Sequence, residues 1–404
     1  MHVPDGFIDA PVSAATAAVA AAAVGVSLRG ARRELDDKAA PLAGLVAAFV
    51  FAVQMLNFPV AAGTSGHLLG GALAAILVGP YTGVLCISVV LLMQGVLFAD
   101  GGLTALGVNI TDMGVVTTVV AYAVFRALVR VLPRGRTGLS VASFAAALIS
   151  VPAAAAAFTL IYALGGTTDV PVGQVFTAMT GVHVLIGLGE AAITALTVSA
   201  VAAVRPDLVH GARDLLRPLE LRTAAVTLPA SPALSSRRDG DQPERRDPAV
   251  PDGLSGDRHR RAGSRGPAAV AAEGVAEAVS ESAGAGTATE PKNAIAPRSA
   301  KRLWLVGVAA ALVCAGGLSY YASTSPDGLE KVAHDKGIDS KEEAHAAKDS
   351  PLADYQVKDV SDERLSGGLA GVIGVGATLA AGTAVFVVLR RRRPARTESE
   401  TAAP

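Results

Sequence analysis

The second residue of the chain is a histidine, and this position allows a compact metal chelate. The amino group of Met1, the backbone nitrogen of His2 and the Nδ1 atom of its ring can bind one metal ion through fused five- and six-membered rings. These nitrogens lie near one plane, and a planar all-nitrogen set suits Ni(II) and Cu(II). The sequence therefore predicts a metal site at the N-terminus, provided that the amine is free.

Residues 1–9 favour a free amine at Met1. They lack the basic segment with which a signal peptide begins, and they contain Asp5 and Asp9 instead, so we expect no cleavage. Aminopeptidases remove an initiator methionine mainly before small residues, and His2 is large. We expect the mature chain to begin with Met1 and His2 on the outer surface of the membrane.

A fourth nitrogen is available from His67, in the segment Gly63-Thr64-Ser65-Gly66-His67. The membrane topology derived below places this segment on the same side as the N-terminus, and it rests on basic residues and not on histidines. The alternative is that His2 and His67 lie in exposed loops by chance.

The composition indicates that membrane helices position these residues. Hydrophobic residues make up 51% of the 404 residues and charged residues 17%, whereas soluble domains carry about a quarter charged residues. A soluble enzyme is disfavoured, and the net charge of zero does not indicate nucleic-acid binding. The sequence predicts an all-α polytopic membrane protein, with seven helices in residues 1–204 and two more near the other end.

The predicted spans are uncharged or nearly uncharged stretches of about 20 residues. Residues 68–99 are too long for one span, and Gly79-Pro80 should divide them into a short helix and a full span, because proline breaks a helix. The predicted helices cover residues 10–28, 39–60, 68–78, 81–98, 103–125, 141–164, 174–204, 303–321 and 367–389.

Basic residues orient these spans, because Lys and Arg collect on the cytoplasmic side. Four clusters follow the first, fifth, seventh and last helices, and all four are cytoplasmic if the N-terminus lies outside and the C-terminus inside. They contain Arg29, Arg32, Arg33 and Lys38; Arg126, Arg130, Arg134 and Arg136; Arg205, Arg213 and Arg217; and Arg390 to Arg393.

The chain divides by composition into four parts. A transmembrane domain at 1–204 is followed by a polar linker at 205–300, which we expect to be cytoplasmic and disordered. A two-span module covers 301–393, and residues 394–404 form a cytoplasmic tail. The loop 325–366 between the last two spans is predicted to lie outside, and it contains 11 Asp or Glu residues against 6 Lys or Arg.

Several segments of residues 1–205 resemble the CbiM/NikM family, which supplies the substrate-capturing S component of energy-coupling-factor importers of cobalt and nickel. Residues 325–330 resemble the PDGLE domain, which is similar to the accessory subunit CbiN/NikN. The chain thus looks like a fusion of the NikMN type, with a seven-helix S-component bundle. The matching segments are Met1-His2-Val3-Pro4-Asp5-Gly6-Phe7, Asn57-Phe58-Pro59-Val60, Gly63-Thr64-Ser65-Gly66-His67-Leu68-Leu69-Gly70-Gly71, Asp100-Gly101-Gly102-Leu103-Thr104-Ala105-Leu106-Gly107 and Ser325-Pro326-Asp327-Gly328-Leu329-Glu330.

This resemblance implies ligands, substrate and partners. The ligands are the Met1 amine, the backbone and ring nitrogens of His2, and His67. The substrate is Ni(II) or Co(II), with no permanently bound cofactor, and the partners are a T-type transmembrane subunit and two ATPases in the plasma membrane. The helix face with which an S component contacts its partner carries small residues, and the stripe Ala10, Ala14, Ala18 and Ala22 fits it. Alternatively, the stripe reflects only the abundance of alanine.

Other polar residues in or near the spans have more than one interpretation each, because polar groups in lipid usually face a cavity or a partner. Asp5 either accepts a hydrogen bond from a ligand's ring or caps the first helix, and Asn57 either orients a histidine ligand or joins helices. Gln94, Asn109 and Asp112 either line the metal route or tie helices together. His183 and Glu190 are seven residues apart on one helix face, and they could pair, line the metal route or anchor the bundle.

His334 and His345 lie in the acidic loop 325–366. They either concentrate divalent cations near the site or belong to a solvated acidic loop. We expect this loop to help load or close the site without supplying its tight ligands.

The leading hypothesis from the sequence is an S component of an ATP-driven importer and not an enzyme. No GxxxxGK[ST] loop occurs, so ATP hydrolysis must come from other chains. The alternatives are a stand-alone secondary transporter or channel for divalent metal and a metal sensor that transports nothing.

Overall fold

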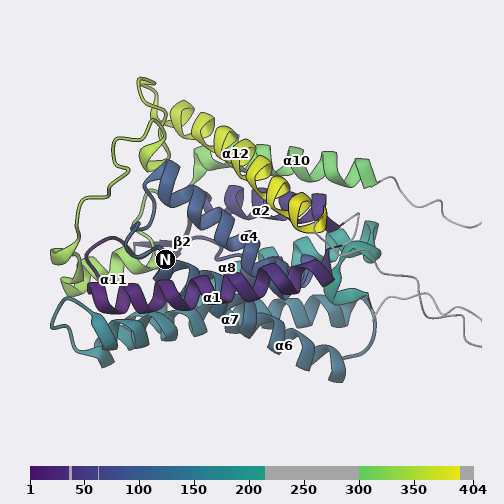
Figure 1. Ribbon diagram of the computed structural model, residues 1–404, viewed down its shortest axis with the longest axis horizontal. Coiled ribbons are helices and arrows are strands. Elements are labelled where there is room, and N and C mark those ends of the chain that lie inside the picture. The colour runs from purple at the N-terminus through teal and green to yellow at the C-terminus, as the bar shows by residue number, and fades with distance from the viewer. Residues whose placement is uncertain (36–38, 62, 214–299, 392–404) are drawn as a thin grey trace, which may run out of the picture. The chain divides into compact units, whose positions relative to one another are not determined.

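The computed structural model describes residues 1–35, 39–61, 63–213 and 300–391, which all belong to one compact unit (Figure 1). Most of the predicted linker 205–300 and the whole predicted tail 394–404 lie outside these residues. The described beginning of the linker forms two short 3-10 turns, Pro206–Leu208 and His210–Ala212.

The N-terminal part is helical, as the sequence predicted. Its helices are α1 (Ala10–Glu34), α2 (Ala39–Gln54), α3 (Gly71–Val78), α4 (Pro80–Met93), α5 (Leu106–Asn109), α6 (Thr117–Val131), α7 (Arg136–Gly165) and α8 (Val172–Val204). The predicted break at Gly79-Pro80 is confirmed, because α3 ends before Gly79 and Pro80 opens α4. Gly79 has a φ of 101°, a conformation that suits glycine, and proline is favoured in a first helical turn.

Within the described residues, seven helical segments are long and apolar enough to cross a membrane. Five belong to the N-terminal part and two to the C-terminal part. Helix α2, with 16 residues, and α3, with 8, are shorter.

The predicted helix over 39–60 was wrong at its C-terminal end. Helix α2 ends at Gln54, and an antiparallel hairpin of β1 (Phe58–Ala61) and β2 (Thr64–Gly66) follows it. Pro59 cannot donate a helical hydrogen bond. The apolar run 55–60 therefore leaves the helix and enters the hairpin that leads to His67.

Two π-helical segments interrupt the helices near the N-terminus of the chain. The first, η1 (Gln94–Phe98), extends α4, and the second, η2 (Ile110–Val116), joins α5 to α6. Such segments are rare and occur frequently at functional sites. Gln94 and Asn109, two of the polar residues singled out in the sequence, stand where these segments begin.

The predicted ligands and the basic clusters lie at opposite ends of the helix bundle. Ile8 forms a β-bridge with Gly166, next to the last residue of α7, which places the N-terminus at that end of the bundle (Figure 1). At the opposite end, Glu34 accepts hydrogen bonds from the backbone of Tyr81 and Thr82, and Arg136 donates to Ala203.

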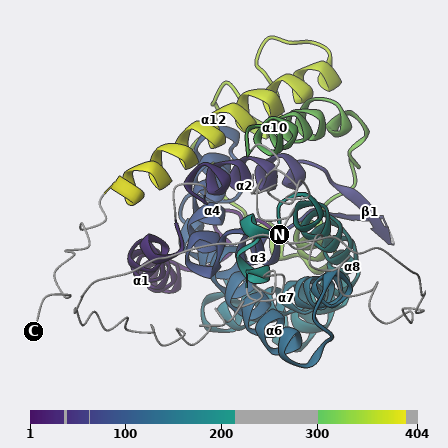
Figure 2. The same cartoon turned by 90° about the vertical axis from the view of Figure 1, so that its right-hand side faces the viewer.

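The C-terminal module consists of α10 (Ala300–Gly316), the 3-10 turn η5 (Leu318–Tyr321), α11 (Gly328–Lys336) and α12 (Glu363–Arg391). Helices α10 and α12 lie beside each other and pack against α2 (Figure 2). A Cβ atom on Gly44 of α2 would lie 2.9 Å from the backbone nitrogen of Thr383 in α12, so the two helices approach closely there. The segment 325–366 is not a simple loop, because it contains α11 and the turns Ile338–Lys341 and Ala353–Tyr355.

Candidate metal centre

The first three residues form a buried segment. Only 2% of Met1 and 9% of His2 are exposed, so these residues are buried within the protein and do not lie in an exposed loop. The side chain of Asn109 accepts from the nitrogen of Val3 at 2.7 Å and donates to its carbonyl at 3.1 Å. The nitrogen of Gly102 donates to the same carbonyl, which fixes the backbone directly after His2.

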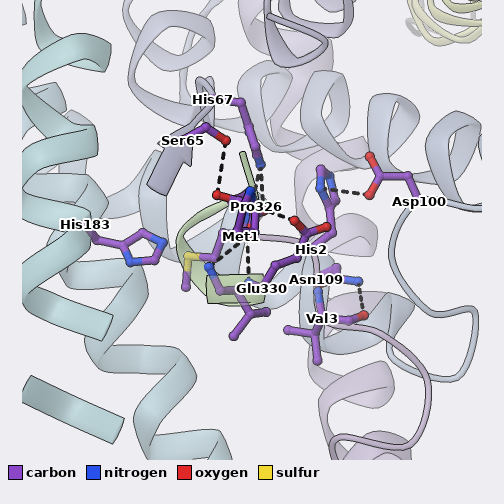
Figure 3. Close-up of polar contacts among 12 residues, drawn as sticks. Met1, His2, Val3, Ser65, His67, Asp100, Asn109, His183, Pro326 and Glu330 are labelled. Atoms are coloured by element: carbon purple, nitrogen blue, oxygen red, sulfur yellow. Dashed lines mark hydrogen bonds and ion pairs between the residues drawn. The ribbon is translucent and has the colours of Figure 1, made fainter. Parts of the chain in front are cut away.

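The amine of Met1 contacts His67 (Figure 3). It also contacts a carboxylate that the sequence did not single out. The distance from the amine to His67 Nε2 is 2.7 Å, and the distance to Asp327 Oδ2 is 2.5 Å. Two nitrogens that bind one metal at right angles are about 2.8 Å apart when each metal–nitrogen bond is about 2.0 Å. The Met1 amine and His67 Nε2 therefore already have the separation of neighbouring ligands.

The His67 ring is oriented by its own backbone. Its Nδ1 lies 3.0 Å from the carbonyl oxygen of Leu68, which can only accept a hydrogen bond. The proton therefore resides on Nδ1, and the lone pair of Nε2 faces the Met1 amine. This pattern is common in metal sites, where a carbonyl fixes the tautomer of an imidazole ligand.

Two buried polar side chains hold the backbone that follows His67. Glu190 accepts from the backbone nitrogens of Leu69 and Gly70, at 2.7 and 3.1 Å, and thereby satisfies donors at the start of α3. The side-chain nitrogen of Gln54 donates to the carbonyl of Leu69 at 3.0 Å. Glu190 is thus an anchor of the bundle and does not pair with His183.

The His2 ring lies beside the His67 ring, with centroids 5.1 Å apart and the planes inclined by 19°. Its Nε2 lies 3.2 Å from Gln94 Oε1, and its Nδ1 lies 3.2 Å from Asp100 Oδ1. Burial lowers the pKa of His2 to about 4, so the ring is neutral at neutral pH. A proton on Nε2 is donated to Gln94 and leaves the lone pair on Nδ1, the ring nitrogen of the predicted chelate, whereas a proton on Nδ1 is donated to Asp100.

The Met1 amine belongs to this cluster together with the two imidazole rings. Among the described residues, no group of three or more His, Cys, Asp or Glu side chains gathers to hold a metal ion. The groups that lie together at this point are the Met1 amine and the rings of His2 and His67.

The other predicted residues near the terminus have structural contacts. Asp5 accepts from the backbone and the hydroxyl of Thr104, at 2.8 and 2.6 Å, and the cap of α1 is Asp9 instead. Asn57 contributes its backbone carbonyl, which accepts from Ser323 of the C-terminal module.

Deeper polar residues separate into two kinds. His183 Nδ1 lies 2.7 Å from the carbonyl of Met179, within its own helix, and the ring lines a small pocket with Met1 and His67. Asp112 is fully buried in η2, and neither of its carboxylate oxygens has a hydrogen-bond partner among the described residues.

The predicted stripe Ala10, Ala14, Ala18 and Ala22 is exposed along α1.

A cavity of about 1000 Å³ lies between the N-terminal segment and the C-terminal module. His345 lines it, with Nε2 3.2 Å from the carbonyl of Gly101, and His334 lines it with its ring largely exposed, 3.2 Å from Asp339. The acidic residues around the cavity are Asp5, Asp100, Asp327, Glu330, Asp339, Glu342, Glu343, Asp354 and Glu363.

Sequence reasoning missed the two carboxylates next to the ligands. Asp100 lies beside His2, and its Oδ2 accepts from the hydroxyl of Tyr355 at 2.5 Å. Asp327 had a visible signal, because Asp327-Gly328-Leu329-Glu330 has the spacing of a helix capping box. Its contact with Met1 had none, since the two residues are 326 positions apart.

Comparison with known proteins gives two family matches. The CbiM family, described as the cobalt uptake substrate-specific transmembrane region, matches residues 2–208. The PDGLE domain matches residues 301–391.

Individual relatives match about half of this chain or less. A Haloquadratum walsbyi protein named for metal transport is 42% identical over 213 residues, which are 52% of this chain and 93% of that protein. The cobalt transport protein CbiM of Sorangium cellulosum is 36% identical over 216 residues, 52% of this chain and 94% of that protein. The fused nickel transport protein NikMN of Rhodobacter capsulatus is 44% identical over 125 residues, 31% of this chain and 36% of that protein.

A crystal structure of a transition metal transporter is also similar, with 26% identity and a TM-score of 0.45 over 50% of this chain and 93% of that chain. The extent of the family match decides the assignment, because it covers half of the chain and contains both histidines. The chain belongs to the CbiM family, and it carries a PDGLE domain in its C-terminal part.

Proposed function

We propose that the protein captures Ni(II) or Co(II) for an ATP-driven importer of the energy-coupling-factor type. The observation that carries this proposal is the 2.7 Å separation of the Met1 amine and His67 Nε2, with the imidazole lone pair facing the amine. The family assignment and the names of the relatives support metal transport by a multi-pass membrane protein.

The substrate ion is bound by four nitrogens in this proposal. They are the Met1 amine, the deprotonated backbone nitrogen of His2, its ring Nδ1, and His67 Nε2. Such a set accepts both nickel and cobalt, and the Irving–Williams order favours nickel only modestly. Residues that orient the rings, Gln94 and the Leu68 carbonyl, tune these ligands without touching the ion.

The acidic cavity is the route by which the ion reaches the nitrogens. Clefts lined by one sign of charge raise the local concentration of oppositely charged ions. Carboxylate oxygens bind Ni(II) and Co(II) more weakly than nitrogen does, so cations can enter from the cavity and pass on. His334 and His345 belong to this outer, weaker set.

The proposed orientation has the N-terminus and the cavity outside and the C-terminus inside. It is supported by the position of the basic clusters, which follow α1, α6 and α8 at the end of the bundle opposite to the histidines (Figure 1). In the complex, the exposed alanine stripe of α1 contacts a T-type subunit, and two ATPase subunits supply ATP hydrolysis.

Replacing either histidine tests the site. We expect His2→Ala and His67→Ala each to abolish tight Ni(II) binding by the purified full-length protein in calorimetry, because each removes at least one of four ligands. His334→Ala is the matched control, since it removes an imidazole from the exposed wall of the same cavity. The control should keep tight Ni(II) binding, because His334 is not one of the four proposed ligands. Wild-type affinity in either His2→Ala or His67→Ala would contradict the site.

Uptake assays separate this function from the two alternatives. Cells that lack the partner ATPase should accumulate no nickel or cobalt through this protein. Accumulation that survives this loss would indicate a stand-alone secondary transporter or channel. Tight binding with no accumulation in the presence of all subunits would indicate a sensor.

A further inference from the structure

The side chain of Asp327 reaches from the C-terminal module to the terminal amine. Its Oδ2 lies 2.5 Å from the Met1 nitrogen and 3.5 Å from His67 Nε2. Asp327 is buried, with 7% of its surface exposed. The carboxylate thus stands beside two of the proposed ligands at once.

The two oxygens of this carboxylate have different tasks. Oδ1 accepts from the backbone nitrogens of Leu329 and Glu330, at 2.7 and 2.9 Å, and so caps α11. The Glu330 side chain accepts in return from the nitrogen of Asp327 at 2.8 Å, which completes a capping box. The helix end therefore fixes the side chain and leaves Oδ2 free to face the amine.

The segment that carries Asp327 is seated on the bundle at two places. The nitrogen of Ser65, in the strand that leads to His67, donates to the carbonyl of Pro326 at 2.8 Å, and its hydroxyl donates to the carbonyl of Ser325 at 2.7 Å. On the other side, a Cβ atom on Gly328 would lie 2.8 Å from Ile186 of α8. The carboxylate is therefore held in register with His67.

We propose that Asp327 is a positioning residue of the metal site, which holds the Met1 amine beside His67 and supplies a negative charge to the bound ion. This proposal rests on the proposed function, since it requires that the amine and the histidines bind the metal. A divalent cation brings at least as much positive charge to this place as the ammonium that Asp327 faces without metal. The carboxylate therefore has an electrostatic partner in both states, and it acts through the amine without being a ligand.

The test removes the charge of Asp327 and keeps its cap. Asparagine and serine both cap helices well, so α11 should persist in Asp327→Asn and Asp327→Ser. Asp362→Asn is the matched control, because Asp362 caps the start of α12 through the nitrogens of Arg364 and Leu365 and is exposed. The purified full-length proteins are titrated with Ni(II) at one pH, and the d–d absorption of the bound Ni(II) is recorded.

We expect both Asp327 variants to bind Ni(II) about 10–100-fold more weakly, which is the usual effect of losing a group that orients a metal ligand. The absorption band should keep its position, because the four nitrogen ligands are unchanged, and Asp362→Asn should match the wild type. If Asp327 only maintained the fold, its loss would disturb the ligand geometry and change the absorption band. An unchanged band together with weaker binding therefore indicates a positioning role.

Wild-type affinity in both Asp327 variants would overturn the proposal, because the ion pair would then serve only to dock the module. A shifted absorption band would also overturn the proposal, because it would show that Asp327 is itself a ligand of the Ni(II) ion. Failure of the proposed function looks different, since His2→Ala and His67→Ala would then leave Ni(II) binding unchanged.

Discussion

The chemistry of His2 depends on which of its ring nitrogens carries the proton. Gln94 Oε1 favours a proton on Nε2, which leaves the lone pair on Nδ1 for the proposed chelate, whereas Asp100 Oδ1 favours a proton on Nδ1. The same logic applies to His67, where the Leu68 carbonyl holds the proton on Nδ1. The sequence singled out both histidines and the amine as candidate ligands, which the structure brings close together, and it pointed to Gln94 as a polar residue in a span. It could not reveal the ring orientations, which depend on contacts with residues distant in sequence.

Gln94→Leu should weaken Ni(II) binding by about 10–100-fold, since the variant keeps a similar volume but no longer accepts the Nε2 proton of His2. Calorimetry on the purified protein measures the change. Gln174→Leu makes the same exchange at an exposed position in the first turn of α8 and should bind like the wild type. Equal affinities for the two variants would remove Gln94 from the site.

A single Gly placed before Met1 should stop uptake. The amine would move one residue away from His67, and the nitrogen of Met1 would become a peptide nitrogen that can no longer serve as the amine ligand. The extended terminus can still chelate a metal by itself, with His2 now third in the chain. Nickel uptake by cells that carry all subunits measures the effect, and a normal rate would refute a role for the free amine of Met1.

At the scale of elements, short-range signals predicted the helices well and their ends less well. The break between α3 and α4 was predicted correctly from Gly79-Pro80. Pro80 has no N–H group with which to continue a helix, and glycine readily adopts the positive φ that Gly79 has in the structure. The end of α2 was missed because residues 55–60 are as apolar as a span. Pro59 ends the helix, and the pairing of β1 with β2 and the contact of Ser65 with Pro326 stabilise the hairpin that replaces it. The helix α11 was missed because its charged sequence lies in a segment that was read as a loop.

Glu190→Leu tests how α8 supports the loop that carries His67. The backbone nitrogens of Leu69 and Gly70 would lose their acceptor inside the bundle, at a cost of about 1–3 kcal/mol for each group in the free energy of unfolding. Ni(II) affinity should fall as well, because the backbone after His67 loses its anchor. Thermal unfolding and calorimetry on the same sample measure both effects.

Glu190→Gln provides the comparison, since its amide oxygen can still accept one of the two hydrogen bonds. It should lie between the wild type and Glu190→Leu in both measurements. A Glu190→Leu protein with unchanged unfolding temperature and affinity would show that the start of α3 holds without this carboxylate.

At the scale of the whole molecule, two parts of the chain that the sequence treats as separate both contribute residues to the candidate site. The matches to residues 2–208 and 301–391 identify the parts, and the resemblance predicted that they are fused. Neither periodicity nor motif spacing could predict that α10 and α12 pack on α2, because small residues that permit close helix contact are frequent throughout this chain. The contact of Asp327 with Met1 follows from that packing.

Expressed as two chains, residues 1–215 and 297–404 should still support nickel uptake, at a lower rate than the fused protein. The packing of α12 on α2 should bring them together, while the fusion raises their effective concentration. Gly44→Leu blocks the close approach to Thr383 and should abolish uptake by the two chains while reducing it less in the fused protein. Absence of uptake from the unaltered pair would indicate that the covalent connection itself is required.

The ion pair between Met1 and Asp327 also has a consequence for biosynthesis. The partner of the first residue is made 326 residues later. At about 5–20 residues per second, the ribosome reaches it roughly 16–65 s after it has made Met1. During this interval the hydrogen bonds of the Val3 backbone with Asn109 can already form, but the Met1 amine cannot yet pair with Asp327. The contacts of the N-terminus are thus completed late in translation. Any enzyme that modifies the Met1 amine must act before the last helices are in place.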